Sequence, residues 1–349
     1  METIGTILIA VLAFSFLIFI HEFGHYIFAR IFKVTITEFS IGMGPKLVWY
    51  DSKKTGIRYA LSMIPIGGYV AMVGEDEESS DPNSFDKKPA WQRFIITIAG
   101  ASVNIIAGFI AMIILAVIVD FGGTTVAEFI DTEASGYEIS SEDSGLMQGD
   151  VIISVNGKRV RVADELSYEI MRHGNEPVDL VVERDGRRIP LSDVVFPVVE
   201  ESGQRFGMID FKVYRTDKTF ASVINYSFTK GALIVRMCWE SIYDLLVGRY
   251  TLAAVSGPIG ISETIGNAAK AGFTSLLYIV ALISINLGVM NLLPIPALDG
   301  GRLICILFEM ITRKRIPKKI ESAVNAIGLL LLLAFSLIIM VKDVIALII

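Results

Sequence analysis

The sequence predicts a polytopic α-helical membrane protein with an α+β domain inserted between its membrane helices. Of its 349 residues, 53% are apolar and 19% are charged, whereas soluble domains average about 45–50% and about 25%. The mean hydropathy of +0.58 points the same way. Four uncharged stretches are each long enough to cross roughly 30 Å of hydrocarbon as a helix: residues 3–20, 94–119, 271–298 and 322–341.

The same counts exclude two other classes of protein. The 31 basic and 37 acidic residues leave a net charge of −6, so there is no basic excess to neutralise nucleic-acid phosphates. The two cysteines, Cys238 and Cys305, are too few for a disulfide framework. The first apolar stretch has neither a basic leading region nor a small-residue cleavage site, so we expect a retained helix rather than a signal peptide.

Basic residues near the helix ends predict the orientation in the membrane, because cytoplasmic loops carry an excess of Lys and Arg. Such residues flank the loop between the first and second stretches and fill the loop between the third and fourth. We therefore expect both loops in the cytoplasm, with both chain ends and residues 120–270 outside the cell membrane. The basic residues are Arg30, Lys33, Lys87, Lys88 and Arg93 in the first loop and Arg313, Lys314, Arg315, Lys318 and Lys319 in the second.

Residues 126–212 have the pattern of a small α+β domain. Residues 151–155 form a strand-like run that ends on Asn156-Gly157, a strong tight-turn signal. Residues 163–173 are helical by pattern, with Leu166, Ile170 and Met171 on one face. Residues 178–190 predict a hairpin that turns at Asp185-Gly186.

The segment 218–250 predicts an amphipathic helix rather than a membrane span. Arg236, Glu240 and Asp244 follow one another at intervals of four and form a charged stripe. We expect this helix on the outer membrane surface or braced against the other helices. The predicted organisation is thus a membrane core of residues 1–120 and 256–349, the α+β domain at 126–212, and this helical segment.

The first candidate site is the pattern His21-Glu22-Phe23-Gly24-His25. Residues four apart lie on one face of a helix, so both imidazoles can reach one ion, with Glu22 close enough to act on a water. This is the HExxH arrangement in which two histidines bind Zn²⁺ and the glutamate is the general base. The alternative is a chance pattern whose histidines satisfy each other. Ionisable groups inside a membrane span are costly, and three of them within five residues favour the functional interpretation.

A catalytic zinc site normally has three protein ligands, and the best third candidate is Asp299. It ends the uncharged run 271–298, just after Pro294 and Pro296, which must break helical hydrogen bonding. Both motifs lie toward the cytoplasmic ends of their spans. The alternative is that Asp299 only marks the membrane boundary. His173, the remaining histidine, is expected at the end of a surface helix in the outside domain.

These paired motifs resemble the signature of the site-2 protease family, HExxH in a first transmembrane helix and NxxPxPxLDG in a later one. The segment 145–160, GLMQGDVIISVNGKRV, resembles the PDZ domain of bacterial membrane proteases, the alternative being an unrelated β-rich domain. The whole chain is therefore similar to bacterial RseP/RasP-type regulated intramembrane zinc metalloproteases with one PDZ domain. Shorter pieces that resemble the family are residues 42–45, 64–70 and 256–259.

The resemblance implies roles for particular residues. His21, His25 and Asp299 would bind Zn²⁺, Glu22 would be the catalytic base, and Asn291 would help to position the substrate. One departure is Ala101, which stands where the family often has proline. A second is that only one PDZ unit fits here, whereas some relatives carry two.

The resemblance also implies a β-hairpin within residues 39–72 that dips into the membrane beside the metal. The residues themselves support strand structure here, because apolar and aromatic residues alternate between positions 57 and 63. A sheet edge beside the metal would offer hydrogen-bond partners to an unwound substrate helix. The alternative is an ordinary cytoplasmic hairpin packed on the helix bundle.

The function we expect is that of a zinc-dependent endopeptidase that cuts the transmembrane segments of single-span membrane proteins near their cytoplasmic ends. Anti-sigma factors and remnant signal peptides are examples of such substrates. The partners would be these substrates and the lipid bilayer, and no nucleic acid. The PDZ-like domain would be a size filter or a docking module. The rival hypotheses are a metal transporter with a transit site and a membrane-anchored scaffold with an inactive metal site.

Overall fold

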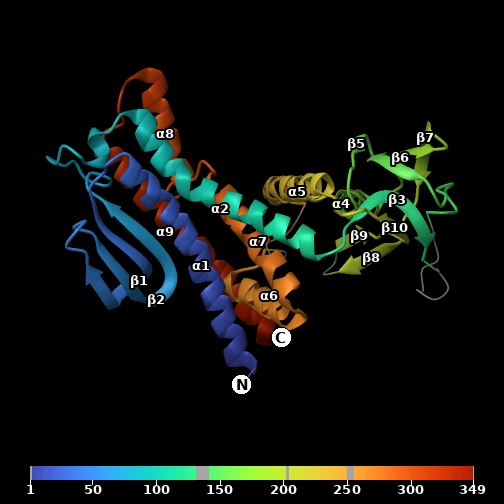
Figure 1. The fold of residues 1–349 in the computed structure, drawn as a ribbon, viewed down its shortest axis with the longest axis horizontal. Helices are drawn as coiled ribbons and strands as arrows, with labels where there is room; N and C mark the ends of the chain where they lie inside the picture. Colours follow the sequence, from blue (N-terminus) through green and yellow to red (C-terminus); the bar gives the residue numbers. More distant parts are fainter. Residues whose placement is uncertain (1, 131–140, 202–203, 250–254, 349) are drawn as a thin grey trace. The chain divides into compact units, whose positions relative to one another are not determined.

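The computed structural model describes residues 2–130, 141–201, 204–249 and 255–348 (Figure 1). The chain separates into two compact units, Met1–Ala111 with Ile234–Ile349, and Met112–Leu233. Two long helices, α2 and α5, contribute residues to both units. The domain limits expected from the sequence stay a prediction, since compactness alone does not assign a membrane core or an outside domain.

Four of the described helices are long and apolar enough to cross a membrane, as the composition predicted. Helix α1 continues without a break from the uncharged stretch 3–20 through the HExxH motif to Ile31. The motif therefore lies within the first of these four helices, as expected from the sequence. The four helices are α1 (Glu2–Ile31), α2 (Ala90–Ile118), α7 (Phe273–Asn291) and α9 (Lys318–Ile348).

The third span is shorter than the uncharged run 271–298 suggested. Gly272, with a φ of 119°, separates α6 (Pro258–Ala271) from α7, which ends at Asn291. The run to Leu298 is not helical, because Pro294 and Pro296 each lack an N–H and restrict the preceding residue. A separate helix, α8 (Asp299–Thr312), then begins at the candidate ligand.

Strands β1 (Ile36–Asp51) and β2 (Arg58–Met72) form the hairpin, and they pair with each other twice. Residues 36–41 pair with residues 68–72 on one side and with residues 58–61 on the other. Residues 58–62 also pair with residues 46–51, on the side away from residues 36–41. The sharp bends that this needs fall at Gly42 and Gly67, with φ of 84° and 88°. The segment 68–72, called the edge strand below, is thereby left at one edge of the sheet. The membrane association of the hairpin stays a prediction.

Helix α1 packs against both the hairpin and α2. The cluster of buried side chains between them comes from α1, the hairpin and the start of α2. A Cβ on Gly24 would lie 2.6 Å from the carbonyl oxygen of Ala99, so only glycine permits this approach of α1 to α2. The cluster is Ala29, Val34, Ile36, Phe39, Ile57, Val70, Phe85 and Ile96, with Phe85 in a short 3₁₀ helix, Phe85–Lys87.

The second unit is built on an antiparallel sheet with the strand order β10-β3-β4-β6-β7, and the short strand β5 pairs with β4 (Figure 1). Helix α4 (Ala163–His173) covers its core, and β8 and β9 form a separate hairpin. The strands are β3 (Gly122–Phe129), β4 (Val151–Val155), β5 (Lys158–Arg159), β6 (Val178–Arg184), β7 (Arg187–Val194), β8 (Val198–Glu201), β9 (Gln204–Gly207) and β10 (Phe211–Arg215).

Local patterns in this unit were predicted closely. The strand at 151–155, the helix at 163–173 and the turn at Asp185-Gly186 are all confirmed. Leu166 and Ile170 are fully buried, but the placement of Met171 on the same face was wrong, because Met171 is 39% exposed. Successive residues of a helix are about 100° apart around its axis, so the side chain of Met171 points away from the core that Ile170 faces. The likeness to a PDZ domain stays a prediction.

Helix α5 (Phe220–Leu246) forms where the amphipathic segment was predicted, and it is not one of the four helices apolar enough to span. Its stripe contains the pair Arg236–Glu240 at 4.0 Å. Asp244 is buried and faces Arg249 at 3.4 Å. The position of α5 relative to the membrane surface stays a prediction.

The packing of α4 gives a test of the second unit. We expect Leu166→Ala to lower the free energy of unfolding of this unit by about 2–5 kcal/mol, because it leaves a cavity in a closed core. Met171→Ala, on the exposed face of the same helix, should change it by less than about 0.5 kcal/mol. Proteolysis of the full chain in increasing urea, followed at sites in this unit, measures both. Equal effects of the two changes would contradict the described core.

Candidate metal centre

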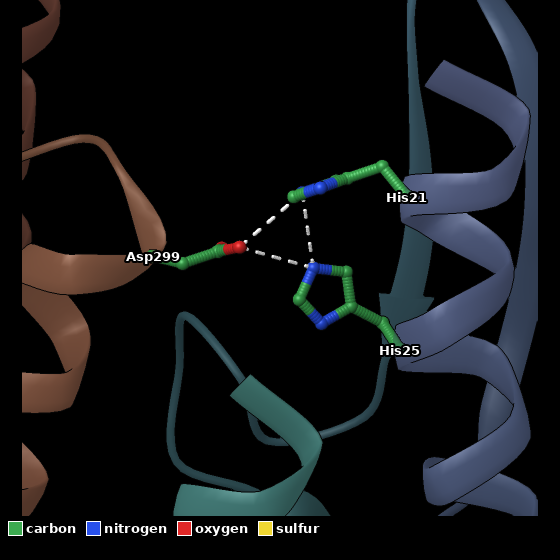
Figure 2. A group of neighbouring side chains, drawn as sticks. All are labelled: His21, His25 and Asp299. Carbon is green, nitrogen blue, oxygen red and sulfur yellow. Dashed lines mark hydrogen bonds and ion pairs between the residues drawn. The ribbon is translucent and has the colours of Figure 1, made fainter. Parts of the chain in front are cut away.

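Two histidines of α1 and one carboxylate of α8 point toward a common centre (Figure 2). His21 and His25 are one turn apart, and their Nε2 atoms lie 3.3 Å from each other. Oδ2 of Asp299, the first residue of α8, lies 3.2 Å from Nε2 of His21 and 3.3 Å from Nε2 of His25. Among the described residues this is the one group of three such side chains whose ligand atoms could hold a metal ion.

The spacing of these three atoms fits zinc. Zinc binds nitrogen and oxygen at about 2.0–2.1 Å in tetrahedral geometry, which separates neighbouring ligand atoms by roughly 3.3 Å. Oδ2 of Asp299 is buried and has no hydrogen-bond partner within the described chain, as expected of an oxygen that faces a cation. The donor set, two imidazoles and one carboxylate, is also one that zinc enzymes use.

The remaining ring nitrogens are held by α2. Nδ1 of His25 donates to the carbonyl oxygen of Ile96 at 2.8 Å, which leaves Nε2 with its lone pair free for a cation. The amide nitrogen Nδ2 of Asn104 lies 3.4 Å from Nδ1 of His21. An amide turned by 180° keeps its shape, and with Oδ1 toward the ring Asn104 accepts the Nδ1 proton. Its Oδ1 has no other partner in the described chain.

A glycine makes room for the centre. A Cβ on Gly100 would collide with the ring of His25. Gly100 and Gly24 thus both serve the contact of α1 with α2, one beside the metal ligand and the other beside the α2 backbone. The close helix contact and the ring position therefore depend on the same small residues.

The far end of α8 is also anchored. Glu309 accepts hydrogen bonds from Arg93 of α2 at 2.6 Å and from Arg315 at 2.9 Å. Burial raises the pKa of Glu309, but the two guanidinium groups outweigh burial and hold this pKa below its ordinary value. Glu309 therefore stays charged, and the helix that carries Asp299 is fixed to α2.

The centre opens into a cavity of about 680 Å³. Glu22 lines it, and the backbone of Val70 hydrogen-bonds the Glu22 carboxylate. The edge strand forms one wall, so backbone at a sheet edge faces the same space as the two histidines. The other lining residues are Met43, Glu75, Asp76, Thr97, Ala297, Leu298, Arg302, Asn325, Ala326 and Leu329.

The structure brings together four of the five residues singled out from the sequence: His21, Glu22, His25 and Asp299. Asn291 is the last residue of α7 and is not among the residues that line the cavity, so its role in positioning a substrate stays a prediction. His173 ends α4, as expected, with Nε2 3.6 Å from Glu169.

Sequence reasoning missed three polar residues around the centre. Asn104 orients His21, Arg302 lines the cavity one turn after Asp299, and Asn325 of α9 accepts a hydrogen bond from the backbone of Ala297 at 3.3 Å. A polar residue inside an apolar run is a signal that could have pointed to Asn104 and Asn325. Nothing in the local pattern distinguishes Arg302 from other basic residues near a helix start.

Comparison with known proteins agrees with this centre. The family model described as "Peptidase family M50" matches residues 9–335. A protein of Clostridium perfringens is 35% identical over 340 residues, 97% of this chain and 98% of that protein. One of Fusobacterium nucleatum is 34% identical over 353 residues, again 97% and 98%. One of Helicobacter pylori strain J99 is 32% identical over 343 residues, 92% and 94%. Each of the three is named a "Putative zinc metalloprotease".

Asp299 is the ligand most open to test, because it comes from a different helix. We expect Asp299→Ala to lower zinc affinity more than about 100-fold, since even an outer partner of a ligand is worth about 10–100-fold. Elemental analysis of the purified protein gives the zinc stoichiometry. His173→Ala, which removes the histidine outside the site, should keep a full complement. A full complement of zinc in Asp299→Ala would mean that Asp299 is not a ligand and only marks the membrane boundary.

Proposed function

From the premise that the chain belongs to peptidase family M50, the site-2 proteases, we propose that this membrane zinc metalloprotease cuts single-span membrane proteins within their transmembrane segments. The observation that carries the proposal is one cavity that contains the HExxH residues, Asp299 and an edge strand. A soluble peptidase needs no such site inside a membrane helix, because its substrates are already extended.

The chemistry follows from the residues of the cavity. His21, His25 and Asp299 would hold the zinc ion, which when bound supplies a positive charge that polarises the scissile carbonyl and lowers the pKa of a water toward about 7. Glu22 takes a proton from that water as the water oxygen attacks the carbonyl carbon. The C–N bond then breaks, and Glu22 gives the proton to the leaving amine.

The edge strand offers a way to present a substrate. A transmembrane helix hides its carbonyl groups in its own hydrogen bonds, so it must unwind before it is cut. An added strand would exchange those bonds for bonds to the edge strand. The support is that residues 68–72 lie at an edge of the sheet and line the cavity.

We propose that the hairpin enters the membrane. It carries exposed apolar and aromatic residues, which favour the membrane interface and core. Large exposed apolar groups on a hairpin are costly in water. They are Met43, Leu47, Val48, Trp49, Tyr50, Leu61, Met63 and Ile64.

The excess of basic residues in the two short loops supports a cytoplasmic position for these loops and a cut near the cytoplasmic end of the substrate. The second unit would then lie outside the cell membrane. As a PDZ-like domain, it would act as a size filter or dock an end left by an earlier cut, which places the protease in regulated intramembrane proteolysis. Anti-sigma factors and remnant signal peptides have the required single span.

Glu22→Gln tests the hydrolytic assignment. We expect it to keep zinc and fold but to lose at least about 100-fold in turnover, because an amide cannot take the proton of the water. The assay is purified protein in liposomes with a single-span model substrate, with product mass read with and without a chelator. Glu78→Gln, a nearby carboxylate outside the metal cavity, is the control and should behave as wild type. Near-normal turnover in Glu22→Gln, or zinc flux without cleavage, would contradict a protease.

Removal of the sheet domain of the second unit, residues 122–215, tests the filter. Gly122 of β3 pairs with Arg215 of β10, so residues 122–215 can be replaced by a short Gly/Ser linker without stretching the chain. We expect this variant to cut a short-ectodomain substrate at a rate within about tenfold of wild type, because no proposed ligand is removed. Discrimination against a long ectodomain should weaken. A folded, zinc-bound variant that cuts neither substrate would mean that the unit belongs to the catalytic assembly.

A further inference from the structure

The segment directly after the edge strand is held by two cationic side chains from the C-terminal helices. Nη1 of Arg302 binds the carboxylate of Glu75, and Nη2 binds Oδ1 of Asp76 at 2.6 Å. Lys318, at the start of α9, donates to the backbone carbonyl of Gly74 at 3.2 Å and to that of Glu75. We call the contacts of Arg302 with Glu75 and Asp76 the latch.

The latch joins the two walls of the catalytic cavity. Arg302 lies three residues after Asp299 on α8, so both side chains emerge from the same side of the first turn. Glu75 lies three residues after Met72, where the edge strand ends, and its N–H donates to the Met72 carbonyl at 3.3 Å. One guanidinium therefore connects the helix of a metal ligand to the strand that faces that metal.

The ion pair is partly sheltered from solvent. The side chains of Arg302 and Glu75 are 27% and 18% exposed, so solvent screens them less than a surface pair. Both line the cavity of the metal centre, and both also line a second, polar cavity of about 260 Å³. The contact of Arg302 with Glu75 thus borders both cavities, one of which contains the metal centre.

We propose that Arg302 is a positioning residue that keeps the edge strand in register with Asp299, so that a single peptide bond of a bound strand faces the metal. This inference rests on the proposed presentation of substrates by the edge strand. Adjacent residues of a strand are about 3.3 Å apart, so a small slip brings a neighbouring bond to the reacting position. An error near 1 Å can already cost about 100-fold in rate.

The test uses a variant that removes the latch without leaving a buried charge alone, Arg302→Gln with Glu75→Gln. Two measurements need no substrate: zinc stoichiometry, and amide hydrogen exchange of residues 68–76 in the zinc-loaded full-length protein. A third is the distribution of cleavage positions in a single-span substrate, read by product mass. Arg302→Lys keeps one charged contact. Arg58→Gln is the control, because it removes an ion pair with Asp51 elsewhere in the same hairpin.

We expect the double variant to keep its zinc, to exchange amides in residues 68–76 at least about tenfold faster, and to cut at several neighbouring bonds with turnover reduced about 10- to 100-fold. Arg302→Lys should be intermediate, and Arg58→Gln should match wild type in all three measurements. Unchanged amide exchange together with a single cleavage position would overturn the proposal. Loss of zinc or of folded protein would also overturn it, because the latch would then have only a structural role. If wild type cuts no single-span substrate, the proposed function fails, and hydrogen exchange alone decides the latch.

Discussion

The structure depends on keeping three polar ligands together at the depth of a membrane helix. A charged or polar side chain in hydrocarbon is costly unless it is paired or binds a cation. His21 and His25 meet that condition only because Asp299 arrives from another helix and because Ile96 and Asn104 hold their outer nitrogens. The close contact of α1 with α2, the break before α8 and the anchoring of α8 through Glu309 can all be understood as ways to hold this group.

The break between α7 and α8 shows how one requirement shapes a long segment. If α7 continued as a helix beyond Asn291, each further residue would advance the chain by about 1.5 Å along the helix axis and move Asp299 on in the same direction. The prolines instead turn the chain, and the oxygen of Asn325 accepts the N–H of Ala297, whose φ is 73°. Non-helical backbone at this depth is tolerated where it is buried or lines a cavity, and Ala297 and Leu298 do line the cavity.

Sequence reasoning succeeded where the information is local and failed where it is not. The spacing of His21 and His25 is a property of one helix, and the turn at Asp185-Gly186 is a property of two residues, so both could be predicted. The twofold pairing of β1 with β2 is not local: residues 36–41 pair with two segments that follow them at different distances. Asp299 could be proposed because it follows two prolines at the end of an uncharged run, but its contact with the two histidines is not a local property. The contact of Arg302 with Glu75 spans 227 positions in the chain and has no signature in either segment.

The sheet domain of the second unit, residues 122–215, leaves and rejoins the chain at neighbouring points. Gly122 pairs with Arg215, and Arg215 also binds Asp120 at 2.7 Å. A module whose ends meet in this way can be lengthened, exchanged or duplicated with little change in the distance that its flanking helices must span. Natural variation should therefore accumulate inside the module while the membrane segments around it keep their geometry. In evolutionary terms, this arrangement separates the choice of what reaches the protease from the chemistry that it performs.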